Sequence, residues 1–354
     1  MSILVPAVTS AIALVFAVLL LDQWRVRRRA FQLAWAAGML FFGVASGCEA
    51  IGAASGWNET LYRAWYLAGA MWTAGWLGLG TALLLGRTRF GYAFAASLVL
   101  AGVFTLLTQR RYDYPGAGSA PVLYLVAALV LALAVAVETY FANERWPWLA
   151  ALAVGGVTIV SLGLMLATAL AAPYALLPSG LPDPVLFPGT LRLLTPFMNI
   201  TGGLALVLGA FFSTYVFMPK RRLLVYSLDP AQKGDELLFN MVIACVAIPV
   251  NFVASLPGAA RELLAGRLHS RVPATILIAI GGFLAAGPDL LSRFGVPDYM
   301  GIGKLLAVIC LFAGFLVSID AFAEFRVPFT AIVLRRRRER APEANVGRGE
   351  AGPT

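Results

Sequence analysis

Hydrophobic residues occur along this chain in long runs that are separated by short polar segments. Seven runs precede residue 219, at approximately 2–21, 31–54, 64–86, 90–108, 122–141, 147–172 and 193–218. Each run has about the 20 apolar residues that a helix needs to cross a bilayer. The pattern predicts an all-α fold, a polytopic transmembrane helix bundle, in which residues 1–218 form a seven-span unit.

Three more apolar runs follow, at 237–256, 273–291 and 302–323. The first two contain prolines and glycines, which interrupt helices and are typical of broken or re-entrant membrane segments. We therefore expect two to three further membrane segments within 219–334, which gives nine to ten in total. The sequence over 258–271 mixes leucines with charged residues and predicts a short amphipathic helix on the membrane surface.

The composition supports a membrane protein and argues against a separate soluble domain. Hydrophobic residues make up 60% of the chain and charged residues 13%, and the mean hydropathy is +0.81. The longest polar stretches have 20 residues or fewer, whereas even small domains need about 50. We therefore expect no fused kinase, nucleotidase or ligand-binding head.

The basic residues predict how the bundle is oriented. The net charge of +9 arises from Arg and Lys clusters between the apolar runs, as in the cytoplasmic loops of membrane proteins. If the N-terminus is outside, the inner loops of the seven-span unit hold eleven basic residues and the outer loops four. This bias predicts an outside N-terminus and anionic lipids as partners of the inner loops, not nucleic acid. No protein partner is indicated.

The C-terminal segment 335–354 is predicted to be a basic, disordered cytoplasmic tail, because it is rich in small, polar and helix-breaking residues. A cytoplasmic tail and an outside N-terminus require an odd number of crossings, so we prefer nine segments to ten. The tail opens with arginines that we expect to face anionic lipid, namely Arg335, Arg336, Arg337, Arg338 and Arg340.

Several kinds of membrane protein are disfavoured by residues that the chain lacks. Its single histidine, His269, cannot supply two axial ligands to a haem, and neither an HExxH zinc motif nor a GxxxxGK[ST] phosphate loop occurs. The lysines disfavour a retinal Schiff base because Lys220, Lys233 and Lys304 lie in loops or at the end of a run. We predict no catalytic residue, no metal and no cofactor.

Other residues inside or near the runs predict packing. The third and seventh runs have small residues at four-residue spacing, which lets helix backbones approach closely. These residues are Ala70, Ala74, Gly78 and Ala82 in the third run, and Ala205, Gly209 and Ser213 in the seventh. The cysteines, which lie inside apolar runs and are expected to be buried thiols, are Cys48, Cys245 and Cys310. Aromatic residues around the outer loop at 55–63 predict a membrane-surface belt, formed by Trp57, Tyr62, Trp65 and Tyr66.

Glu49 is the most unusual residue inside a predicted span. It lies in the outer half of the second run among small residues, where a carboxylate costs about 2–3 kcal/mol on insertion scales. Thr73, Asn199 and Thr201 are expected at a similar depth, and Asn251 follows a proline in the run 237–256. We predict that these five residues line a substrate or ion pathway. The alternative is a structural role, in which they form hydrogen bonds between helices.

Two blocks resemble uncharacterised bacterial multi-pass membrane proteins, GWNETLYRAWYLAGAMWTAGWLGLGTALLLG (56–86) and VAIPVNFVASLPGAARELLAGRLHSRVPATILIAIGG (246–282). The resemblance implies a location in the bacterial inner membrane and no particular activity. From the residues we expect a small-solute or ion transporter-like permease with a polar site in the outer half of the bundle. The alternative is a non-catalytic membrane subunit or a receptor-like sensor without a transport pathway.

Overall fold

The structure is a computed structural model that describes most of the chain. The described residues are 3–112, 114, 116–141, 144–170, 172–226, 237–265, 268–269, 271–292, 300–317, 324–326 and 333–335. Helices dominate them because a helix satisfies its backbone N–H and C=O groups within one segment, as an apolar environment requires.

The elements follow one another with short connections over most of the chain. In order, they are α1 (Leu4–Arg27), α2 (Ala30–Ser55), α3 (Glu59–Trp65), the π-helix η1 (Tyr66–Trp72), α4 (Thr73–Leu84), α5 (Gly91–Tyr112), α6 (Ala120–Tyr140), α7 (Trp146–Ala167), the 3-10 helix η2 (Pro184–Leu186), α8 (Gly189–Phe217), α10 (Leu237–Leu264), α11 (Arg271–Ser292), α12 (Met300–Val317), β1 (Glu324–Arg326) and β2 (Val333–Arg335). Because α3, η1 and α4 are contiguous, residues 59–84 form one span-length rod.

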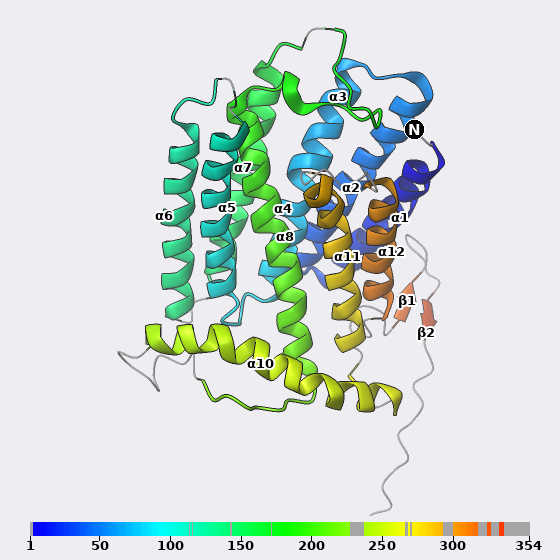
Figure 1. Ribbon diagram of the computed structural model, residues 1–354. Helices are drawn as coiled ribbons and strands as arrows, with labels where there is room; N and C mark the ends of the chain where they lie inside the picture. The colour runs from blue at the N-terminus through cyan, green and yellow to red at the C-terminus, as the bar shows by residue number, and fades with distance from the viewer. Residues whose placement is uncertain are drawn as a thin grey trace, which may run out of the picture.

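Eight helical segments of the described residues are long and apolar enough to cross a membrane. All of these except α10 stand side by side in an upright bundle (Figure 1). The shorter apolar helices α11 and α12 stand beside them and pack against each other, α11 also against α8 and α12 against α1. This architecture confirms the predicted helical bundle of a membrane protein.

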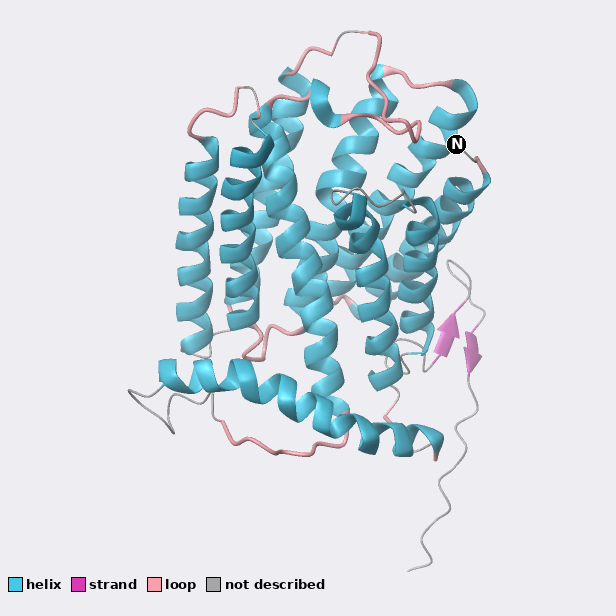
Figure 2. Cartoon of the chain, in the orientation of Figure 1, coloured by secondary structure: helices cyan, strands magenta, loops and turns pink. Residues whose placement is uncertain are grey.

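The remaining span-length helix, α10, lies across one end of the bundle instead of alongside the other helices (Figures 1 and 2). It is continuous through Pro249 and Pro257, so the expected break is wrong. A proline removes one hydrogen bond from a helix and does not have to end it. The separate surface helix expected over 258–271 is also wrong, because 258–264 form the last turns of α10 and Arg271 begins α11.

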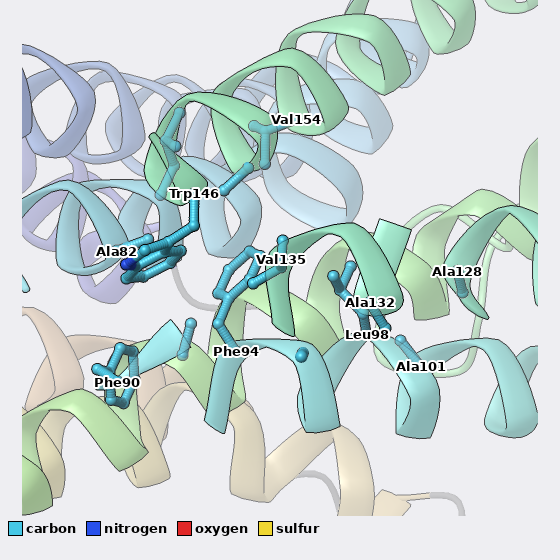
Figure 3. Close-up of a cluster of buried hydrophobic side chains, with 14 of the residues drawn as sticks. Ala82, Phe90, Phe94, Leu98, Ala101, Ala128, Ala132, Val135, Trp146 and Val154 are labelled. Carbon is cyan, nitrogen blue, oxygen red and sulfur yellow. The ribbon is translucent and has the colours of Figure 1, made fainter. Parts of the chain in front are cut away.

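The largest hydrophobic core lies between α4, α5, α6, α7 and α8. Trp146, at the start of α7, is almost fully buried there, and its ring centroid is 5.7 Å from that of Phe94 on α5. Its indole Nε1 donates a hydrogen bond of 3.0 Å to the carbonyl of Gly86. Figure 3 shows Phe90, Phe94 and Trp146 gathered at one end of this core, with alanines of neighbouring helices beside them.

The predicted small-residue series confirm a close approach of α4 and α8. A methyl group on Gly78 would lie 2.5 Å from Cα of Gly202, and one on Gly209 would lie 2.2 Å from Cγ2 of Thr81. Neither position has room for a side chain. Backbone contact at this seam brings Thr73 and the residues that precede it against α8, which positions the candidate site.

The C-terminal strands form a two-stranded antiparallel sheet in which Phe325 lies opposite Leu334. Arg335 is the last residue of β2. The other arginines predicted to face lipid, Arg336, Arg337, Arg338 and Arg340, lie outside the described residues, as does the rest of the predicted tail.

Candidate functional site

Glu49 forms an ion pair with Lys304 inside the bundle. The Lys304 Nζ lies 2.5 Å from Glu49 Oε1, and only 3% of the Glu49 side chain and 22% of the Lys304 side chain are exposed. Glu49 is six residues from the end of α2, and Lys304 is four residues from the start of α12. Since a helix rises about 1.5 Å per residue, both charges lie roughly 6–9 Å inside the ends of their helices. The pair therefore joins α2 to α12 below the surface of the bundle.

The sequence predicts Lys304 at the end of an apolar run, and the structure places it near the start of α12 with its side chain directed into the bundle. A lysine near the end of a span usually extends toward water. Here α12 packs beside α1, with Gly301 next to Val5, and this neighbour directs the Lys304 side chain to Glu49. One signal was available in the sequence, because Lys304 is the only basic residue in the run 302–323.

Trp65 supplies a second donor to the same carboxylate. Its indole Nε1 donates a hydrogen bond of 2.8 Å to Glu49 Oε1, the atom that also contacts Lys304. Trp65 is the last residue of α3, and the π-helix η1 begins at the next residue. π-helical turns are rare and occur frequently at functional sites. The aromatic-belt composition predicted only surface contacts here, and no sequence pattern indicated the π-helix.

Trp57 covers Glu49 toward the end of α2. Its ring packs against Gly52, where a methyl group would lie 2.4 Å from Cε2 of the indole. The Trp57 Nε1 donates a hydrogen bond of 3.0 Å to the carbonyl of Gly180, and its ring centroid is 6.2 Å from that of Trp65. The Glu49 side chain is almost fully buried, and exclusion of water strengthens its attraction to Lys304.

The π-helix connects this site to α8. The hydroxyl groups of Tyr66 and Thr195 form a hydrogen bond of 2.8 Å, and Thr195 precedes Pro196, which lies inside α8. Within the rod, the Thr73 hydroxyl donates to the carbonyl of Ala68 over 2.8 Å. The π-helix therefore contacts α8 at the residue next to Pro196. Irregular backbone and proline both allow a membrane helix to change shape.

Thr201 is buried but does not contact Glu49. It lines a cavity of about 10 Å³ between α4, α5, α7 and α8, together with Gly75 and Met198. Its hydroxyl has no hydrogen-bond partner among the described residues. The cavity is mostly apolar, and neither Glu49 nor Lys304 lines it. Asn199 is half-buried on α8.

Asn251 belongs to the opposite end of the bundle and not to the predicted pathway. It is fully buried on α10, where its side-chain oxygen accepts hydrogen bonds from the backbone N–H groups of Leu223 and Leu224 at 2.8 and 3.0 Å. Its Nδ2 donates to the Leu224 carbonyl over 2.8 Å. These contacts fix the loop that follows α8 to α10, so Asn251 has a structural role.

Searches of family models, curated proteins and solved structures found no match to this chain. In the part of the chain that the structure describes, no group of three or more His, Cys, Asp or Glu side chains is placed to hold a metal. The two charged groups that the structure brings together at the site are Glu49 and Lys304. A proton or cation that reaches Glu49 competes with Lys304 for one carboxylate oxygen, and its arrival would release Lys304 from α2.

Proposed function

We propose that the chain crosses a bacterial cytoplasmic membrane nine times, with its N-terminus outside and α10 at the inner end. The excess of basic residues in the loops at that end supports this orientation. The count of nine follows when the seven upright spans from α1 to α8 are joined by α11 and α12, and α10 does not cross. The tail 335–354 is then cytoplasmic.

In this topology the chain acts as a transporter-like permease for protons, cations or small solutes coupled to them. The observation that carries the proposal is the buried Glu49–Lys304 pair next to a π-helix. Ionisable residues inside spans are rare and typically mark ion pathways. Lys304 is the movable partner, because its side chain is more exposed than that of Glu49 and α12 packs mainly against α1 and α11.

Flux measurements on the purified full-length chain in proteoliposomes test this proposal. Proton and monovalent-cation uptake is followed with an internal fluorescent indicator under an imposed gradient, for wild type, Glu49→Gln and Lys304→Met. Gln keeps the shape and the hydrogen-bonding capacity of Glu49 but removes its charge, so flux should fall at least tenfold while the protein remains folded. Arg145→Gln, which removes an exposed basic residue just before α7, is the matched control and should leave flux unchanged.

Either of two results would overturn the proposal. If wild type moves none of the tested ions, the pair serves the fold alone. If wild type moves an ion and Glu49→Gln moves it at the same rate, the ion does not pass through the Glu49 site.

The second candidate is a non-catalytic membrane subunit or receptor-like sensor without a transport pathway. The observation that favours it is the close packing around Glu49, where Trp57 lies on Gly52 and the cavity lined by Thr201 does not extend to the pair. In that case Glu49→Gln should change thermal stability without any change in flux.

A further inference from the structure

The two sides of α10 differ in polarity and in exposure. One side is buried and carries Asn251 and Ser255, whose exposed fractions are 0% and 1%. The other side carries Val242, Val246 and Val253, which are exposed to 66%, 59% and 63%. At about 100° per residue, Val246 and Val253 point to the side of the helix opposite Asn251. α10 is therefore amphipathic, but its exposure is the reverse of that in a soluble protein. Protein covers its polar side, and its apolar side is exposed.

The covering element is the loop that follows α8. Besides the three hydrogen bonds of Asn251, the Ser255 hydroxyl accepts one from the backbone N–H of Arg221 at 2.8 Å. Figure 2 shows this loop, in pink, along the side of α10 that faces away from the bundle. Because the loop lies on that side, the bare valines are directed back toward the level of the upright helices, where the lipid would be.

Basic residues surround α10. Lys220, Arg221 and Arg222 are exposed in the covering loop, and Arg261 is exposed in the last turn of α10. The guanidinium of Arg271, at the start of α11, lies 4.6 Å from the ring centroid of Phe217. Among the described residues from 218 to 271, the only acidic residue is Glu262. An apolar side bordered by positive charge is complementary to the surface of an anionic bilayer.

We propose that α10 does not cross the membrane but lies in the headgroup region of an anionic leaflet, held parallel to it by the Asn251 clamp. The clamp consists of the side chains of Asn251 and Ser255 and their hydrogen bonds to 221–224. The valine side enters the acyl boundary, and the surrounding basic residues bind phospholipid headgroups. This inference concerns α10 alone and holds whether or not the chain transports anything.

Depth measurements with nitroxide labels on the full chain in nanodiscs test the orientation of α10. Cys245 lies on the exposed side of α10 and becomes a single label site after Cys48→Ala and Cys310→Ala. Further single sites are made by Val242→Cys, Val253→Cys and Leu256→Cys in a background without the native cysteines.

All four sites should report one shallow depth, about 5–10 Å below the headgroups. A crossing helix would instead change depth by about 21 Å between positions 242 and 256, and that gradient would overturn the proposal. Ile159→Cys, on the exposed middle of α7, is the deep reference, and Ser119→Cys, exposed in the loop between α5 and α6, is the reference in water.

The lipid preference is tested separately, by native mass spectrometry of nanodiscs made from phosphatidylcholine with or without phosphatidylglycerol. The variant with Lys220→Gln, Arg221→Gln and Arg222→Gln should lose more than tenfold of its preference for the anionic lipid, at about fivefold per basic residue. The matched variant with Lys220→Arg, Arg221→Lys and Arg222→Lys should keep it. An equal preference in wild type and the Gln variant would overturn the role of the basic residues.

Discussion

Glu49 on α2 and Asn251 on α10 are both buried polar residues in apolar helices, but their helices lie in different directions. α10 is no less apolar than α2, yet α2 stands in the bundle and α10 lies across its end (Figure 1). The partners of the two side chains differ. Glu49 is paired with side chains of other helices, whereas Asn251 binds the backbone of the loop that leads toward its own helix.

This difference shows how a polar residue can determine the orientation of an apolar helix. Glu49 can remain inside the bundle because Lys304 neutralises its charge and Trp65 donates a hydrogen bond to it. Asn251 needs three backbone groups of 223–224, which belong to the loop that follows α8. Since breaking these bonds would leave several buried groups unsatisfied, α10 stays with its loop.

The largest effect is expected from breaking the ion pair on one side. Lys304→Met leaves the Glu49 carboxylate buried with only Trp65 as donor, and the free energy of unfolding should fall by about 3–5 kcal/mol. Combining Glu49→Gln with Lys304→Met removes both charges and should restore stability to within about 1 kcal/mol of wild type. Denaturant titration in detergent measures the free energy of unfolding of both variants. An equal loss of stability in the single and the double variant would show that Glu49 and Lys304 do not form a stabilising ion pair.

The Asn251 clamp should give the next largest effect. Asn251→Ala removes three hydrogen bonds and leaves backbone groups of Leu223 and Leu224 without partners, which should cost about 2–3 kcal/mol. Hydrogen exchange should speed up at the amides of these two leucines and remain slow around Glu49. Asn251→Asp keeps the acceptor for both amides but places a carboxylate oxygen against the Leu224 carbonyl, so it should protect the amides better than Ala does and still be less stable than wild type. If the Leu223 and Leu224 amides exchange as fast in wild type as in Asn251→Ala, Asn251 does not protect them and there is no clamp.

A smaller effect is expected at Thr201, which belongs to neither network. Its hydroxyl is buried without a partner among the described residues, so Thr201→Val should leave the melting temperature unchanged or stabilise the fold by up to about 1 kcal/mol. Thr73→Val, which removes a hydrogen bond to Ala68, is the control and should destabilise by about 1 kcal/mol. Loss of stability in Thr201→Val would show that its hydroxyl binds a group in the cavity.

The smallest effect at neutral pH concerns Tyr226, at the end of the covering loop. Burial, helped by the nearby Tyr215, raises the pKa of Tyr226 to about 12 from the usual value of 10. Because the folded chain favours the protonated phenol, this contribution to stability is complete below pH 10 and is lost as pH rises toward 12. Tyr226→Phe should flatten the loss of thermal stability between these pH values and change little at pH 7. A steeper loss in Tyr226→Phe would contradict this reasoning.

The candidate site was only partly predictable. Glu49 could be identified because a carboxylate inside an apolar run is costly and needs a partner. Its partner Lys304 could not be identified, since 255 residues separate them and a lysine near a span end normally extends to the surface. Expected depth groups Thr201 with Glu49, and a nearby proline singles out Asn251, but neither criterion gives the direction in which a side chain points.

By itself, the sequence determined that this protein is a helical membrane bundle with close contacts along α4 and α8. Both properties depend on quantities summed or repeated along one segment, namely the length of an apolar run and the spacing of small residues. Only the tertiary structure decided that α10 lies across the bundle, that Lys304 reaches Glu49 and that the rod formed by 59–84 contains a π-helix. These properties depend on which groups of other segments come within hydrogen-bonding distance, and no single segment carries that information.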